Sequence, residues 1–181
     1  MPLSLDHVPE LCKVGLDPEI WTYTLVLIRN QEEMKRYVET ALRAQAEGTA
    51  LPFATIDKES GQVAGSTRFG SIDRSHKRVE IGWTWLGKEF QRTPLNTEAK
   101  YLMLKHAFET WGCNRVEFKT DVLNENSRTA LRRIGAKEEG ILRRHMITAT
   151  GRARDSVYYS IVNSEWYDVK RLLEQKLLAN T

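Results

Sequence analysis

The chain has little of what marks a secreted, membrane or metal-binding protein. Its two cysteines, Cys12 and Cys113, lie far apart and form no CxxC pair, which favours reduced thiols over a disulfide framework. Residues 1–13 lack the basic start and apolar run of a signal peptide, and no apolar run approaches the roughly 18 residues that span a bilayer. The four histidines show no spacing such as HExxH. We therefore expect a cytoplasmic protein without a membrane partner or a metal site.

Charge and composition exclude few further classes of protein or partner. The net charge of +3 is too small to indicate a nucleic acid or an anionic membrane as partner, although it agrees with mild attraction to anionic ligands. Repeats, low-complexity runs and linkers are absent. With 181 residues, 41% of them hydrophobic and 28% charged, the chain is long enough for one globular domain with a substantial core. We expect residues 1–20 to form an N-terminal extension and residues 21–181 to form this domain.

Hydrophobic spacing and stop signals predict the secondary structure. Asn30 and Glu33 form a capping box at the start of a helix, and Gly112 and Gly135 end two later helices. The turn at 58–61 joins two strands into a hairpin. The alternation favours an α/β (or α+β) domain, whose mixed, mostly antiparallel sheet is flanked by helices. In chain order we expect strand 22–28, a helix from Asn30 to Gly48, strands 51–57, 62–72 and 78–86, helix 97–111, strand 115–120, helix 125–134, strands 139–146 and 155–162, and a helix from Ser164.

The most informative segment is 80–109, where a strand leads through a polar turn into a helix. The strand ends near Leu86, the turn reads Gln91-Arg92-Thr93-Pro94-Leu95-Asn96, and the helix starts at Thr97. The first N–H groups of such a helix have no intrahelical acceptor and lie at the positive end of the helix dipole. They suit a phosphate or pyrophosphate, so we expect a site for a phosphorylated cofactor. No Gly-Lys-Ser/Thr follows the turn, which disfavours a P-loop.

Two motifs carry a resemblance to a known family. The first is this turn, which stands where the pattern Q/R-x-x-G-x-G/A precedes a pyrophosphate-binding helix. The second is Asn124-x-x-Ser127, followed by Gly135-Ala136 in the manner of an N-x-x-S…G-[FA] signature. Together with the order of the elements, they make residues 20–170 similar to the GNAT acyltransferases. The specific resemblance is to the RimJ/RimL-like branch, which acetylates the N-termini of ribosomal proteins.

The turn departs from the family pattern at two positions. Pro94 and Asn96 replace its two small residues. Pro94 has no backbone N–H, so one phosphate donor is lost. Arg92 can add a charge-assisted contact, and Asn tolerates left-handed backbone better than most residues. We therefore still expect the turn to bind a pyrophosphate.

The resemblance implies a single-domain GNAT fold and acetyl-CoA as the donor. It also implies direct attack of an amine on the thioester in a ternary complex. Glu80 would be the general base, directly or through water, because an alkylammonium has a pKa near 10. Ser127 would donate a hydrogen bond to the leaving thiolate, and Asn124 would bind the pantetheine amide. The cofactor-binding residues would be Trp85, Leu86, Gln91, Arg92, Thr93, Leu95, Asn96, Thr97, Asn124 and Ser127.

Each of these roles has a structural alternative that the sequence leaves open. Glu80 could be an exposed strand glutamate paired with Arg78 or Arg68, and Asp155 and Glu117 are weaker candidates for the base. Asn124 and Ser127 stand where a helix cap is favoured, and a cap at a helix mouth is compatible with a role toward the cofactor.

Substrate residues are expected on the neighbouring strands. Trp83 and Trp85 fall on one face of their strand and Thr84 on the other. They are either core residues or the wall of a substrate channel that also includes Arg68 and Phe69, where an arginine would suit a carboxylate-bearing substrate. The C-terminal third is basic, as solvated surface or as a contact for the 3′-phosphate of CoA or for ribosomal RNA; its arginines are Arg132, Arg133, Arg143, Arg144, Arg152 and Arg154.

We therefore predict an acetyl-CoA-dependent N-acyltransferase. Its acceptor is a ribosomal or other protein N-terminus or a small amine, and nucleic acid enters only through the ribosome. The alternatives are transfer of a larger acyl group such as succinyl, and a non-catalytic acyl-CoA-binding domain. The helix from Trp166 to Leu177 covers either the core or a partner, which leaves a homodimer open.

Overall fold

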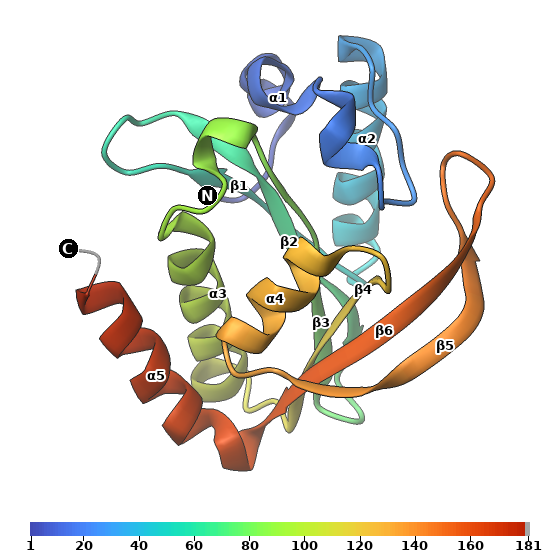
Figure 1. Ribbon diagram of the computed structural model, residues 1–181. Coiled ribbons are helices and arrows are strands. Elements are labelled where there is room, and N and C mark those ends of the chain that lie inside the picture. Colours follow the sequence, from blue (N-terminus) through green and yellow to red (C-terminus); the bar gives the residue numbers. More distant parts are fainter. Residues whose placement is uncertain (180–181) are drawn as a thin grey trace.

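A computed structural model describes residues 1–179 as a six-stranded sheet with helices on both faces (Figure 1). No helix within these residues is both long and apolar enough to cross a membrane. The α-helices are α1 Val8–Gly15, α2 Gln31–Ala46, α3 Leu95–Lys105, α4 Glu125–Arg133 and α5 Trp166–Leu178. The strands are β1 Leu51–Ile56, β2 Val63–Asp73, β3 Arg78–Leu86, β4 Arg115–Asp121, β5 Lys137–Ile147 and β6 Ala153–Val162.

The strand order is β1-β2-β3-β4-β6-β5, and all neighbours are antiparallel except β3 and β4. The sheet is therefore mixed and mostly antiparallel, as predicted. The β5–β6 hairpin extends past the rest of the sheet toward the side of α2 (Figure 1).

The sheet separates two hydrophobic cores. One face packs against α3, α4 and α5, with Phe69, Ile81 and Phe118 among its buried side chains. The other face packs against α1 and α2 and includes Trp21 and Trp85. The α5 helix buries Trp166, Val169 and Leu173 in the first core, so the predicted C-terminal helix covers the core.

The sequence signals placed most elements correctly. The side chain of Asn30 accepts the N–H of Glu33 and the side chain of Glu33 accepts the N–H of Arg29, which completes the expected capping box. Strand 78–86 has its predicted bounds. The α3 helix begins at Leu95, two residues before the predicted start, and continues as a π-helical turn at His106–Thr110 before Gly112 ends it with φ 62°.

The predicted strand 22–28 is wrong. Its β-branched residues favour a strand, but the segment is irregular, and Thr24 closes a local turn onto the Trp21 carbonyl while Ile28 is buried against α2. The edge of β1 is occupied instead by residues 1–3: the N–H of Leu3 donates to the Pro52 carbonyl, and Met1 exchanges hydrogen bonds with Ala54. Strand propensity has no effect where no ladder partner is available.

The first twenty residues pack closely on the rest of the chain. Leu3, Val8 and Leu11 are buried in the same core as α2 and Trp85. Gly15 lies so close to Trp85 that a Cβ at this position would be 2.6 Å from the indole ring. The α1 helix thereby supports the end of β3 that leads to the candidate site.

Candidate active site

The site begins where two parallel strands separate. β3 and β4 pair only from Arg78–Glu80 to Arg115–Glu117, although β3 runs on to Leu86 and β4 to Asp121. A bulge accompanies the separation, because Trp83 and Thr84 on β3 lie opposite the single residue Thr67 on β2. Trp83 has a φ of 50°, as expected for a bulged residue that turns its strand. Beyond Glu80, the facing backbone groups of β3 and β4 are left for another partner.

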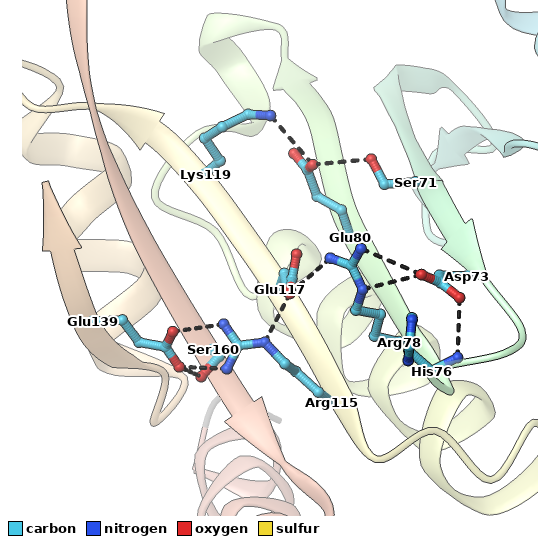
Figure 2. Close-up of polar contacts among 10 residues, drawn as sticks. All are labelled: Ser71, Asp73, His76, Arg78, Glu80, Arg115, Glu117, Lys119, Glu139 and Ser160. Carbon is cyan, nitrogen blue, oxygen red and sulfur yellow. Dashed lines mark hydrogen bonds and ion pairs between the residues drawn. The ribbon is translucent and has the colours of Figure 1, made fainter. Parts of the chain in front are cut away.

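Glu80 lies at the fork, the point beyond the Glu80–Glu117 pair at which β3 and β4 separate. The residue is buried, with 5% exposed, and its Oε2 is 3.4 Å from both the Ser71 hydroxyl and the Lys119 ammonium group. Figure 2 shows these as separate contacts that reach the carboxylate from β2 and β4. The other oxygen lies above Gly82, within 3.0 Å of where a Cβ would be. A buried carboxylate next to an open strand edge is well placed to accept a proton.

A chain of ion pairs holds the closed end of the fork (Figure 2). Arg78 bridges Asp73 and Glu117, and Arg115 bridges Glu117 and Glu139. Hydrogen bonds from Ser75 and His76 lower the pKa of Asp73 to about 2, and Arg115 lowers the pKa of Glu139. Arg78 is thus occupied and does not pair with Glu80.

The two weaker candidates for the base are also occupied. Glu117 accepts hydrogen bonds from Arg78 and Arg115. Asp155 accepts the backbone N–H of Arg144 in the β5–β6 hairpin. Glu80 and Glu117 form the last β3–β4 pair, and Glu80 is the one of the two that no arginine holds within residues 1–179.

Hydrogen bonds hold the turn before α3, but the residue with left-handed backbone is Arg92 and not Asn96. Arg92 has φ 62°, whereas Asn96 is already inside α3. Pro94 is the N-cap with φ −62°, so its ring fits the helix start without strain. The Gln91 amide donates to the Leu86 carbonyl, and the Thr93 hydroxyl donates to the Phe90 carbonyl and lies 3.4 Å from the N–H of Leu95.

The α3 N-terminus has the features that an anionic group requires. Its first N–H groups have no intrahelical acceptors. Arg133 reaches it from α4, where one guanidinium nitrogen donates to the hydroxyl of the buried Thr97 at 3.1 Å. Arg92 lies in the preceding turn. These cationic side chains and N–H groups fit a pyrophosphate. The residues at the fork alone would not bind one.

The Asn124 motif forms the predicted cap. The Asn124 side chain accepts the N–H of Ser127 at 3.0 Å, which starts α4. This hydrogen bond uses the amide oxygen of Asn124 and leaves its NH₂ group available. Asn124 follows directly on β4 and Asp121, so the cap lies on the β4 side of the fork.

The aromatic strand has the predicted alternation. Trp83 contacts Arg68 and approaches Gly70, and Trp85 packs on Trp21, all on the α2 side of the sheet. Trp85 belongs to the core, whereas Trp83 is 43% exposed.

Phe69 does not join this face. It is buried on the opposite side of the sheet against Phe53 and Trp111. The prediction that Phe69 faces the substrate together with Arg68 is therefore wrong, because consecutive side chains of a strand point to opposite faces of the sheet.

A cavity that the sequence did not indicate lies beside the fork on the α2 side. Its volume is about 480 Å³, within the range of small-molecule sites. The irregular segment at 25–29 forms one wall. Because residues 22–28 were expected to form a strand, this wall could not be anticipated. The other lining residues of the cavity are Glu33, Arg36, Tyr37, Thr40, Arg68, Trp83 and Ala149.

Lys100 is a second feature that sequence reasoning missed. It is 4% exposed, and its ammonium group donates to the hydroxyls of Thr84 at 2.6 Å and Thr67 at 3.3 Å. Burial lowers its pKa to about 7. From the sequence, Lys100 looks like a residue on the polar face of an amphipathic helix. Only the fold shows that it is buried against Thr67 of β2 and Thr84 of β3.

Lys100 gives a pH dependence of stability with a definite sign. Between pH 7 and 10.5 the unfolded chain keeps the lysine proton while the native chain has lost it, so native stability rises with pH. From pH 7 to 9 the wild type is expected to gain about 2 kcal/mol relative to Lys100→Met. Urea unfolding of both proteins at a series of pH values measures this difference. Parallel curves would show that Lys100 is charged in the native state throughout.

The basic C-terminal third does not form one patch. Arg132 pairs with Glu125 and Glu138, and Arg152 pairs with the buried Asp121. Arg143 and Arg144 line a separate hollow at the β5–β6 hairpin, whereas Arg133 reaches α3 and Arg154 is buried.

A sheet that forks at a buried carboxylate, with a helix N-terminus suited to pyrophosphate beside it, defines an acyl-CoA-dependent N-acyltransferase. The chain belongs to the GNAT acetyltransferase family, because the family model for the acetyltransferase (GNAT) domain matches residues 1–137. The predicted family, fold class and N-acetyltransferase activity are thereby confirmed.

Individual relatives agree with this assignment. The crystal structure of a "putative acetyltransferase" from T. thermophilus is 36% identical and has a TM-score of 0.88, over 97% of this chain and 91% of that chain. The Bacillus licheniformis protein named "Uncharacterized N-acetyltransferase p20" is 27% identical over 91% of this chain and 92% of its own length. "Putative ribosomal N-acetyltransferase YdaF" of Bacillus subtilis (strain 168) is 36% identical over 59% of this chain. Its name agrees with the predicted ribosomal-protein branch.

Proposed function

We propose that this N-acetyltransferase moves the acetyl group of acetyl-CoA to a primary amine by direct attack in a ternary complex, with Glu80 as the proton acceptor. The observation that carries the proposal is the buried Glu80 carboxylate at the point where β3 and β4 separate. The family uses acetyl-CoA, whose thioester supplies an activated acetyl group. A non-catalytic binding domain would not require a buried carboxylate at this point.

The attacking amine must be neutral, and its proton must leave. The amine nitrogen forms a bond to the acetyl carbon as the carbon–sulfur bond breaks, and the amine proton passes to Glu80 directly or through water. Lys119 and Ser71 hold the Glu80 carboxylate in place. Ser127, at the start of α4, would donate a hydrogen bond to the departing thiolate.

The open edge of β3 would hold the donor. The end of β3 near Trp85 and Leu86 has no strand on the β4 side and is open to an extended chain there, although the Leu86 carbonyl already accepts the Gln91 amide. The NH₂ group of Asn124 remains available for an amide oxygen on the opposite side of the fork. The α3 start would hold the pyrophosphate through the residues Gln91, Arg92, Thr93, Leu95, Asn96 and Thr97.

The identity of the acceptor is not inferred from the names of the relatives. The match to YdaF spans 57% of that protein's length, so its named ribosomal role remains a property of that protein. The surroundings of Glu80 in this chain are the better guide to the acceptor.

Binding and turnover together test the proposal. A saturating concentration of CoA, about 100 times its Kd, is expected to stabilise the protein by about 2.7 kcal/mol, because CoA binds only the native state. Acetyl-CoA with a panel of primary amines should release free thiol in proportion to acetylated product. Dephospho-CoA and pantetheine are matched controls for the phosphate contacts. No thermal shift at millimolar CoA, and no thiol release with any amine, would contradict the proposal.

A further inference from the structure

Buried polar atoms without a hydrogen-bond partner gather on the face of the sheet that carries Glu80. Within residues 1–179 they include Nε of Arg68, Nε of Arg154 and Oγ of Ser156. Val157, next to Ser156, is in the core on the other face, so residues 154 and 156 point to the Glu80 side. Buried polar groups are nearly always satisfied in native proteins, so a group of unsatisfied ones requires an explanation.

Arg68 is the most unusual member of this group. It is only 5% exposed, yet no hydrogen bond or ion pair to its side chain exists within the described residues. Its guanidinium carbon lies 5.2 Å from the centre of the Tyr37 ring and 5.0 Å from that of Trp83, so two aromatic rings hold the cation. A structural arginine at this depth would normally have a carboxylate partner, because an uncompensated buried charge is costly.

The position of Arg68 relates it directly to the reacting centre. Arg68 on β2 is the register partner of Gly82 on β3, and the Glu80 carboxylate lies above Gly82. Arg68 and Trp83 also line the cavity of about 480 Å³. One wall of this cavity is therefore cationic, and Arg68 lies two register positions along β2 from Gly70, the partner of Glu80.

Arg154 adds a second buried cation on the same face. It is 6% exposed, and its one polar contact within the described residues is with the Tyr23 carbonyl at 3.5 Å. Burial lowers its pKa, although Asp121 and Glu80 oppose this effect. Asp121 is already paired with Arg152, so among residues 1–179 Arg154 has no acidic partner of its own.

We propose that the acceptor is a small amine that also carries a carboxylate, as an amino acid does, and that this carboxylate binds Arg68 between Tyr37 and Trp83. The inference rests on the proposed function and names its substrate class. The ammonium end of such a molecule lies toward Glu80 and the carboxylate toward Arg68, so both charges are matched. The planar guanidinium suits bidentate binding of a carboxylate, and a dianion is disfavoured beside Glu80.

The first test measures binding without turnover. With CoA present, L-glutamate and the monoanion propionate should raise the melting temperature of the wild type above that in sodium chloride of equal ionic strength. Arg68→Met should lose this response, and Arg43→Gln, which removes the same charge from an exposed position in α2, should keep it. Arg68→Met should itself be no less stable than the wild type, because it removes an uncompensated buried charge. A purely structural arginine would give a lower melting temperature when replaced.

The second test compares each L-amino acid with its C-terminal amide as acceptor. Amidation lowers the pKa of the amine and favours the amide chemically, so a preference for the free acid reports recognition of the carboxylate. We expect kcat/KM at least about tenfold higher for the acids than for the amides in the wild type, and loss of that preference in Arg68→Met. Arg68→Lys, which keeps the charge without the planar fork, should retain part of the preference and serves if Arg68→Met does not fold.

Three results would overturn the proposal. Equal rates for acids and amides in the wild type would remove the carboxylate from recognition while leaving the N-acetyltransferase reaction intact. An Arg68-dependent preference for succinyl-CoA over acetyl-CoA, without a preference among acceptors, would assign the carboxylate to the donor. No stabilisation by L-glutamate or propionate over chloride would exclude an anion site at Arg68, whether or not any acceptor turned over. Absence of turnover with every acceptor would separately contradict the proposed function.

Discussion

Replacing Glu80 by glutamine is expected to lower kcat for amine acetylation by about 10²- to 10³-fold at neutral pH, the size of effect typical of a lost general base. Glutamine has nearly the same shape and can still accept a hydrogen bond from Ser71, so the fold should persist. It cannot take up the amine proton. The KM for acetyl-CoA should change little, because Glu80 lies at the fork and not along the open edge of β3.

The pH dependence of the variant separates a lost base from a distorted site. Without Glu80 the remaining reaction depends on the fraction of acceptor that is already neutral, so the rate of Glu80→Gln should rise about tenfold per pH unit up to the pKa of the acceptor amine. A distorted site would lower the rate by the same factor at every pH. The pH–rate profiles of both proteins with one acceptor provide the comparison.

Glu117→Gln is the matched control for this substitution. Glu117 is the register partner of Glu80 on β4, but it is held by Arg78 and Arg115. Its replacement should reduce stability through the lost ion pairs and leave kcat within about a factor of three. Full activity of Glu80→Gln at neutral pH, or an equal loss of kcat in Glu117→Gln, would show that the proton leaves by another route.

Local signals explain why much of the fold could be predicted. The capping box at Asn30 and Glu33 and the turn at 58–61 depend on residues close together in the chain, and both formed as expected. The segment 22–28 has equally good local signals for a strand. It failed because residues 1–3 occupy the β1 edge, which no local pattern records.

The candidate site was predictable only in part for the same reason. The resemblance to the GNAT family pointed to the turn before α3 and proposed Glu80 as the base. It could not show that Phe69 and Arg68, adjacent in sequence, serve opposite faces of the sheet. Nor could it show that Arg68 and Lys100 are buried without a carboxylate partner in the described part of the chain, because that depends on every element packed around them.

Gly65→Ala is expected to be the most destabilising single-methyl change in the sheet. Gly65 has φ 157°, and a Cβ there would lie 2.1 Å from the Trp85 carbonyl oxygen and 2.9 Å from the Leu86 Cα. Both atoms belong to the backbone, so neither can move aside as a flexible side chain would. Backbone strain and overlap together should cost about 4 kcal/mol or more of unfolding free energy.

Gly140→Ala is a matched control within the same sheet. Gly140 has φ 155°, almost the same backbone conformation, but nothing lies within 4 Å of its added Cβ. It should therefore lose only the strain contribution, about 1–3 kcal/mol. Denaturant unfolding gives the loss of unfolding free energy for each variant, and the difference between the two losses is the cost of the steric overlap. Equal losses would mean that β2 and β3 can separate at Trp85 without cost.

This contact also bears on the proposed site. The Trp85–Leu86 end of β3, which would pair with the donor, is fixed on one side by β2 at Gly65 and left open on the side of β4. If Gly65→Ala displaces this strand end, the variant that remains folded should show a higher KM for acetyl-CoA, with kcat changed much less because Glu80 lies at the closed end of the fork. A lower kcat with an unchanged KM would place the donor elsewhere than along this edge.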